Sequence, residues 1–221
     1  ILCEGNPDEV TDKLTITNSQ VYNSSNFGIL GRNTSITGEN LIINNSGQSS
    51  FARTLGGKYK WTHCTITNYW NNSFRQFPAL LINNFQETPD AILLADLVEA
   101  NFNNCIIFGN DNPEFIIDEI EEPLTPTLFE FKFTNCLVRF PVGDPNFSGE
   151  NYNFSGPNYE NMAFNQNPDF RDANENDMII GEDSAANGSA FSLIPSGNDI
   201  LGIPRDIDAP DCGAYESIVF E

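Results

Sequence analysis

The sequence predicts an all-β protein: a single-stranded parallel β-helix, or solenoid, of about five to six coils with a C-terminal cap. Three observations indicate this fold. A strand-like segment recurs, its first copies are twenty-odd residues apart, and equivalent positions carry the same kind of side chain. The recurring segments are 16–23, 38–45, 61–68, 102–109 and 133–140. Their alternation and their β-branched or aromatic residues are typical of strands, and Asn, Gly and Ser punctuate them as turns.

Four columns appear when these segments are aligned. The first holds Ile16, Gly38, Trp61, Phe102 and Phe133; the second, Asn18, Asn40, His63, Asn104 and Asn135; the third, Ser19, Leu41, Cys64, Cys105 and Cys136; the fourth, Val21, Ile43, Ile66, Ile107 and Val138. The third and fourth columns are two residues apart, so they share one face of a strand. Their side chains are mostly apolar, and we therefore expect Cys64, Cys105 and Cys136 to stack in the core as small hydrophobes.

The second column predicts a turn ladder. Asn tolerates the left-handed backbone of a tight bend, and its side-chain amide can bond to the Asn of the next coil. His63 is the only histidine of the chain. Because it occupies this column, we expect it to serve in the turn, with catalysis as the alternative.

The chain divides into two parts. Residues 1–165 are expected to form the coils, with a turn at Gly5–Asp8 and insertions near 69–99 and 110–130 that leave the solenoid on one side. Residues 166–221 differ in composition, and we expect them to pack on the last coil and close the open end. Because the chain opens at Ile1, inside a strand, we also expect a longer precursor.

The repeats resemble the right-handed parallel β-helix family with Asn-x-x-Ile-x-Asn turns, and this resemblance implies the right hand. The last fifty residues are similar to the ending of choice-of-anchor Q proteins. The matching stretches are Asn167–Phe170, Ser184–Gly188, Asp199–Arg205 and Asp211–Glu216, with Cys212 where that family usually has Ile. The resemblance implies an extracellular or cell-surface protein of Bacteroidetes-like bacteria, commonly an outer-membrane lipoprotein.

Charge and hydropathy exclude some partners. The net charge is −21, with 10 Lys and Arg against 31 Asp and Glu, so nucleic-acid binding is not expected. The chain has no apolar run long enough for a membrane span. The acidic turn with Asp206, Asp208 and Asp211 offers oxygen ligands at short spacing and is a candidate calcium site. Arg205, Asp211 and Glu216 are alternatively expected to pin the C-terminal region in place.

Candidate ligand-binding residues are few. Tyr69 and Trp70 follow the third repeat and are candidates for stacking on sugars. Arg53 and Arg75 lie in second strands of successive coils and are expected to share a face. The main hypothesis is a noncatalytic role in binding a polysaccharide or a cell-surface protein. The alternatives are a polysaccharide lyase or glycoside hydrolase, with or without dependence on calcium, and a structural stalk or adhesin segment.

Overall fold

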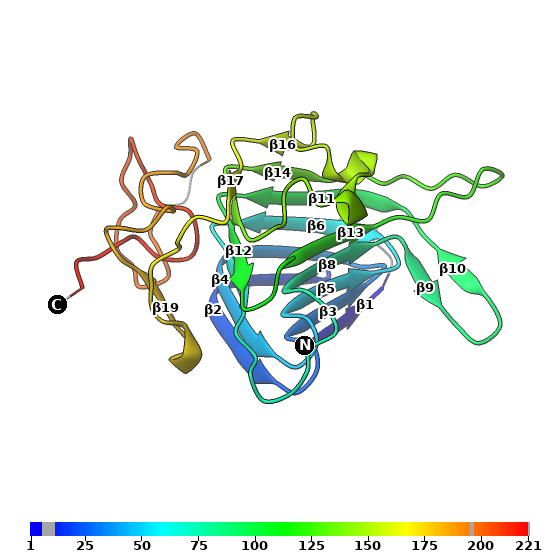
Figure 1. Cartoon of the computed structure of the whole chain (residues 1–221), viewed down its shortest axis with the longest axis horizontal. Helices are drawn as coiled ribbons and strands as arrows, with labels where there is room; N and C mark the ends of the chain where they lie inside the picture. Colours follow the sequence, from blue (N-terminus) through cyan, green and yellow to red (C-terminus); the bar gives the residue numbers. More distant parts are fainter. Residues whose placement is uncertain (6–11, 195–196, 221) are drawn as a thin grey trace.

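The computed structural model describes residues 1–5, 12–194 and 197–220. Most of the predicted turn at Gly5–Asp8 lies outside these residues. The chain is all-β, and its strands stack as the parallel β-solenoid that the repeats predict (Figure 1).

Sheet A forms one wall of the solenoid. Its five parallel strands, in spatial order, are β1 (Leu2–Glu4), β3 (Ile29–Arg32), β5 (Phe51–Thr54), β8 (Leu80–Asn83) and β13 (Phe115–Asp118). The strands alternate in side-chain direction, so Phe51, Leu80 and Phe115 face the interior and join the main core cluster.

Sheet B curls around the other walls. Its strands are β2 (Leu14–Ser24), β4 (Ser35–Ser46), β6 (Gly57–Thr62), β7 (Thr65–Asn68), β11 (Leu97–Asn103), β12 (Ile106–Gly109), β14 (Lys132–Thr134), β15 (Leu137–Val138), β16 (Tyr159–Glu160) and β17 (Ala163–Phe164). The long strand β4 pairs with β6 in its first half and with β7 in its second half. The break between the two halves lies at the bend that the Asn column predicts.

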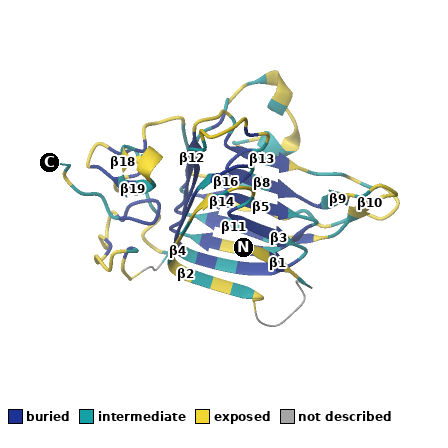
Figure 2. Cartoon of the chain, turned by 90° about the horizontal axis from the view of Figure 1, so that it is seen from below, coloured by how far each residue is buried: buried dark blue, intermediate teal, exposed yellow. Residues whose placement is uncertain are grey.

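The strand register reproduces the sequence columns. Gly38 pairs with Trp61, Trp61 with Phe102, Phe102 with Phe133, and Phe133 with Tyr159. Tyr159 thus begins a further short repeat, which the sequence comparison did not include. Dark-blue strands in Figure 2 mark the buried walls that result.

The third column lies in the core. Cys64, Cys105 and Cys136 are at most 1% exposed and belong to the main core cluster. All five cysteines are free thiols. Burial raises the pKa of Cys105 well above its ordinary value, and the neighbouring Cys136 and Cys64 raise it further.

An aromatic cluster covers the end of the solenoid near β16. It is carried by the segment that contains two short 3₁₀ helices, η1 (Pro145–Phe147) and η2 (Glu150–Tyr152). Phe140 packs on Phe147, Tyr152 and Phe154, with ring centroids 5.0 to 5.2 Å apart. This segment, rather than the C-terminal region, covers that end.

The two insertions lie side by side. The first forms a hairpin of β9 (Phe85–Glu87) and β10 (Ile92–Leu94), which projects from the solenoid in Figure 1. The second insertion passes the base of this hairpin. There the Asn84 side chain donates to Ile120 O at 2.9 Å and to Thr127 Oγ1 at 3.0 Å.

The C-terminal region flanks the solenoid, which corrects its predicted position over the open end (Figure 1). It contains an antiparallel pair, β18 (Phe170–Asp172) and β19 (Asp177–Ile180), and a 3₁₀ helix, η3 (Ala173–Glu175). A second core cluster fills the interface. Its members from the solenoid include Ile42, Ile106, Phe108 and Leu137; those from the C-terminal region include Met178, Ile180, Ala186, Cys212, Ala214 and Tyr215. No helix in the described residues is both long and apolar enough to cross a membrane.

Candidate functional site

The bend column supplies one wall of the site. We call Asn18, Asn40, His63, Asn104 and Asn135 the bend residues. All five have left-handed φ angles, between 47° and 54°. Side-chain hydrogen bonds join them in pairs: Asn40 Nδ2 donates to Asn18 Oδ1 at 3.1 Å, and Asn104 Nδ2 lies 2.9 Å from His63 Nε2.

The C-terminal region docks on the bend residues. Arg205 Nη2 donates to Asn40 Oδ1 at 2.9 Å, and Asn40 Nδ2 donates to Asn198 O at 2.8 Å. Further along the same edge, Asn135 Nδ2 donates to Ser189 O at 2.8 Å. Bend amides therefore hold the C-terminal region as well as one another.

Arg205 is the central charged group of this interface. Its Nη1 donates to Glu216 Oε1 at 2.9 Å and to Asp211 O at 3.2 Å. Burial lowers the pKa of Arg205, while the Glu216 charge opposes that shift. The pinning role expected for Arg205 and Glu216 fits these contacts.

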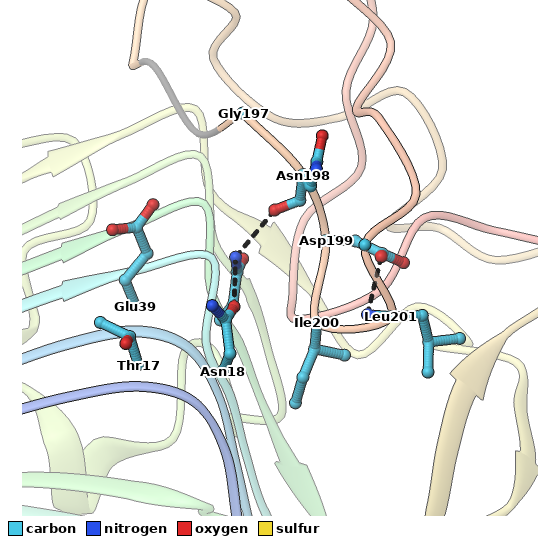
Figure 3. A pocket seen from close by; sticks show the side chains of 10 residues that line it. Thr17, Asn18, Glu39, Gly197, Asn198, Asp199, Ile200 and Leu201 are labelled. Carbon is cyan, nitrogen blue, oxygen red and sulfur yellow. Dashed lines mark hydrogen bonds between the residues drawn. The ribbon is translucent and has the colours of Figure 1, made fainter.

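A polar cleft of about 580 Å³ opens between the bend and the C-terminal region. In Figure 3, Thr17, Glu39 and Asn18 line the solenoid side and residues 198–201 face them. The cleft lining consists of Thr17, Asn18, Glu39, Asn40 and residues 197–202. Thr17 and Glu39 pair in register and directly precede their bend residues.

Asp199 shapes the far wall of the cleft. Its Oδ1 accepts hydrogen bonds from Leu201 N at 2.8 Å and Ile203 N at 2.9 Å, and its Oδ2 accepts from Glu216 N at 3.1 Å. Asp199 is buried, with 2% of its surface exposed. Asp199 is thus committed to holding the loop.

Glu39 is the acidic group available to a ligand. Within the described part of the chain it forms no ion pair and receives no hydrogen bond to its side chain. Among the residues that the structure describes, no Lys, Arg or His lines the cleft. A hydroxyl, an amide and a carboxylate suit a hydroxylated ligand that is neutral or carries a positive group.

A smaller hollow of about 260 Å³ lies on the same flank, over the second half of β2. Gln20 and Tyr22 line it from the solenoid, and Arg171 and Tyr215 from the C-terminal region. Gln20 Nε2 donates to Tyr215 Oη at 3.3 Å. Arg171 is paired with Asp177 there.

Arg53 and Arg75 do not share a surface face, which corrects the sequence-based prediction. Arg53 points into the core and is fully buried, with its guanidinium 4.9 Å from the Tyr59 ring centroid. Arg75 is also buried and makes a two-point ion pair with Glu114, at 2.7 and 2.8 Å. Side chains two residues apart in a strand point to the same face, so Arg53 lies on the inward face with Phe51.

Tyr69 and Trp70 have different surroundings. Tyr69 packs edge-on against Phe170, at a centroid distance of 6.2 Å, and so belongs to the interface with the C-terminal region. Trp70 is half-buried and its Nε1 donates to Ser73 Oγ at 2.9 Å. Neither residue lines the polar cleft.

Asp206, Asp208 and Asp211 do not assemble a calcium site. Asp211 is buried, and its two carboxylate oxygens accept from Gly188 N and Ser217 N. Asp206 Oδ1 accepts from the backbone N–H groups of Asp208 and Ala209, both at 2.9 Å. The described residues contain no group of three or more His, Cys, Asp or Glu side chains placed to hold a metal ion.

Comparison of this chain with protein-family models, with curated protein sequences and with solved structures finds no match.

Sequence reasoning missed Glu39 and the loop of residues 197–202. Glu39 precedes a bend residue, but its column is polar throughout and gave no distinguishing signal. The loop reaches the cleft only because the C-terminal region flanks the solenoid, and no repeat position records that contact.

Proposed function

We propose that this chain is part of an exported or cell-surface bacterial protein that binds a glycan without cleaving it. In this proposal the polar cleft beside Glu39 is the binding place, and the fold is a right-handed β-helix of five to six coils. The similarity of the C-terminal segments to choice-of-anchor Q proteins supports the surface location. Fold analogy alone carries no activity.

The composition of the cleft lining is the observation that carries the proposal. Glycosidases use two carboxylates on one cleft, and here Asp199 is already bonded by three backbone N–H groups. Lyases require a base beside the substrate carboxylate, and the described part of the lining offers no Lys, Arg or His for that role. One free carboxylate among amides and a hydroxyl is suited to recognition, and it favours neutral or amino sugars over polyuronates.

A glycan panel tests this proposal. Neutral, amino-sugar and uronic-acid oligosaccharides would be assayed for retention and for new reducing or unsaturated ends. We expect retention of a neutral or amino-sugar ligand without product, weakened by Glu39→Gln and unchanged by Glu130→Gln, an exposed control. Product formation would contradict the noncatalytic role, and loss of retention in both variants would contradict the cleft.

A hydrolase remains the second candidate because of one further groove, about 410 Å³ in volume, on the outer face of sheet A. Glu87 and Asp118 both line it, with Phe27, Phe77 and Phe85 nearby. Partial desolvation raises the pKa of Asp118, and Glu87 raises it further. A carboxyl of raised pKa beside a second carboxylate is the pattern of an acid and its partner. Any product found in the panel should then disappear in Asp118→Asn.

A further inference from the structure

One bend residue that contacts the C-terminal region, His63, can take up a proton. The other bend residues are asparagines, whereas His63 is an imidazole that is fully buried in the interface. Its Nδ1 lies 3.0 Å from Asp211 O. A carbonyl oxygen only accepts, so Nδ1 must carry the hydrogen.

The other ring nitrogen is correspondingly an acceptor. Asn104 Nδ2 lies 2.9 Å from His63 Nε2, and Asn104 Oδ1 accepts from Phe191 N at 2.8 Å. Asn104 Nδ2 also donates to Phe191 O at 3.3 Å. The contacts with the Phe191 backbone therefore fix which end of the Asn104 amide faces the imidazole.

A second proton on His63 would sit on Nε2, whose neighbour at 2.9 Å is the Asn104 amide nitrogen. It would place an N–H group on Nε2 directly against the Asn104 amide N–H. Turning the amide over would relieve this clash, but it would set donor against donor at Phe191 N. The docked state therefore favours the neutral imidazole, because Nδ1 donates to Asp211 O and Nε2 accepts from the Asn104 amide.

The surrounding charges act in the same direction. Arg205 Nη1 donates to Asp211 O at 3.2 Å, so an imidazolium would share one carbonyl oxygen with a guanidinium. Burial and then Arg205 lower the pKa of His63 from 6.5 to about 3, against the opposing effect of backbone hydrogen bonds to Asp211 and Gly213. Of the ionisable groups nearby, Arg205 acts on His63 directly, and Asp211 and Glu216 are bonded to Arg205; Cys64 follows His63 in the chain. Glu216 is engaged by Arg205, and Asp211 by backbone N–H groups.

We propose that protonation of His63 releases the C-terminal region from the bend residues and thereby opens the polar cleft. The release itself follows from the contacts at His63. Its effect on a ligand rests on the proposed function, because Asn198 and residues 199–202 form the movable wall of the cleft. Acidification would then discharge a bound glycan.

Hydrogen exchange of the free protein tests the release without any ligand. Three amides report docking directly, since their acceptors lie on the solenoid: Phe191 N to Asn104 Oδ1, Gly213 N to Asn104 O, and Ala214 N to Thr65 Oγ1. After correction for intrinsic exchange rates, the open population at these amides should rise by about 50- to 100-fold between pH 7 and pH 4.5. Solenoid amides such as Ile106 N, bonded to Cys64 O, should change much less.

His63→Asn is the matched variant, because Asn occupies the same left-handed position in the other four bends. It should remove most of the pH dependence at the reporter amides, leaving a change of less than about threefold from the nearby carboxylates. A flat wild-type profile, or an unchanged slope in His63→Asn, would overturn the proposal. If His63→Asn does not fold, the size of the wild-type change decides between the outcomes. A rise of about 50- to 100-fold supports the proposal, and a rise of less than about threefold overturns it.

The ligand effect is measured separately. A glycan retained at pH 7 should elute at pH 4.5 from the wild type and stay bound to His63→Asn. If exchange shows the release but no glycan of the panel binds, the proposed function fails and the proton-dependent docking stands. If a glycan binds equally at both pH values while exchange shows the release, its coupling to the cleft is overturned.

Discussion

Replacing Arg53 by Met should stabilise the protein. Arg53 is fully buried in the solenoid, and within the described residues none of its three guanidinium nitrogens has a hydrogen-bond partner. The rings of Tyr59 and Phe102 lie 4.9 and 5.6 Å from its Cζ and offer cation–π contact only. A buried charge without a carboxylate or carbonyl partner opposes folding.

The pKa shift gives the magnitude. Desolvation lowers the pKa of Arg53 from 12.5 to about 9. Each unit corresponds to 1.36 kcal/mol, so holding the charged form in the core costs on the order of 5 kcal/mol. Losing two cation–π contacts offsets about 2 kcal/mol of the gain. Arg53→Met should therefore raise the free energy of unfolding by about 2 to 3 kcal/mol.

Urea denaturation at pH 7 measures this difference, and Arg53→Lys, which keeps the charge, should bring no gain. The pH profile gives a second check. Because the folded pKa lies below the unfolded one, the unfolded state binds more protons between pH 9 and 12.5, so wild-type stability should rise as pH passes about 9. Arg53→Met should lack that rise. A variant less stable than the wild type would show that the guanidinium has a stabilising partner.

Two further substitutions test the packing. Glu114→Gln removes the buried carboxylate that pairs with Arg75, leaving only the exposed Asp111 carboxylate, and should lower the free energy of unfolding by about 3 kcal/mol. Asp111→Asn, at an exposed carboxylate, should cost under about 1 kcal/mol, and equal losses in the two would contradict the assignment. Gly38→Ala should cost about 1 to 3 kcal/mol, because its Cβ would lie 2.4 Å from the Trp61 ring. Gly149→Ala, with open space around its Cβ position, should be neutral in the same thermal-melting assay, and a neutral Gly38→Ala would refute the packing argument.

The repeats predicted the solenoid well because stacking converts sequence columns into physical neighbours. The register of Trp61, Phe102 and Phe133 follows the alignment directly. The sequence predicts coils through residue 165, but the aligned segments end at residue 140 and leave out the short repeat at Tyr159, because a segment rich in Pro, Gly and Asn precedes it. Its Asn161 nevertheless adopts the left-handed φ of 51° that marks each bend.

The position of the C-terminal region was not predictable in the same way. An asparagine side chain at a bend can make more hydrogen bonds than the ladder requires. Asn40 and Asn104 use the remaining Nδ2 hydrogen to bind backbone carbonyls of the C-terminal region. No spacing in the sequence indicates that second set of bonds. The polar cleft arises from it, so the candidate site could not be read from the repeats.

The inward thiols make this protein a reporter of its own unfolding. Cys64, Cys105 and Cys136 are reached by an alkylating reagent only when neighbouring strands part, so the modification rate in dilute iodoacetamide would time the opening of the middle turns. Cys212 sits in the flank instead and is also buried. Mass spectrometry of the labelled peptides would then show whether the C-terminal region detaches before or after the solenoid strands separate. No probe needs to be engineered into the chain.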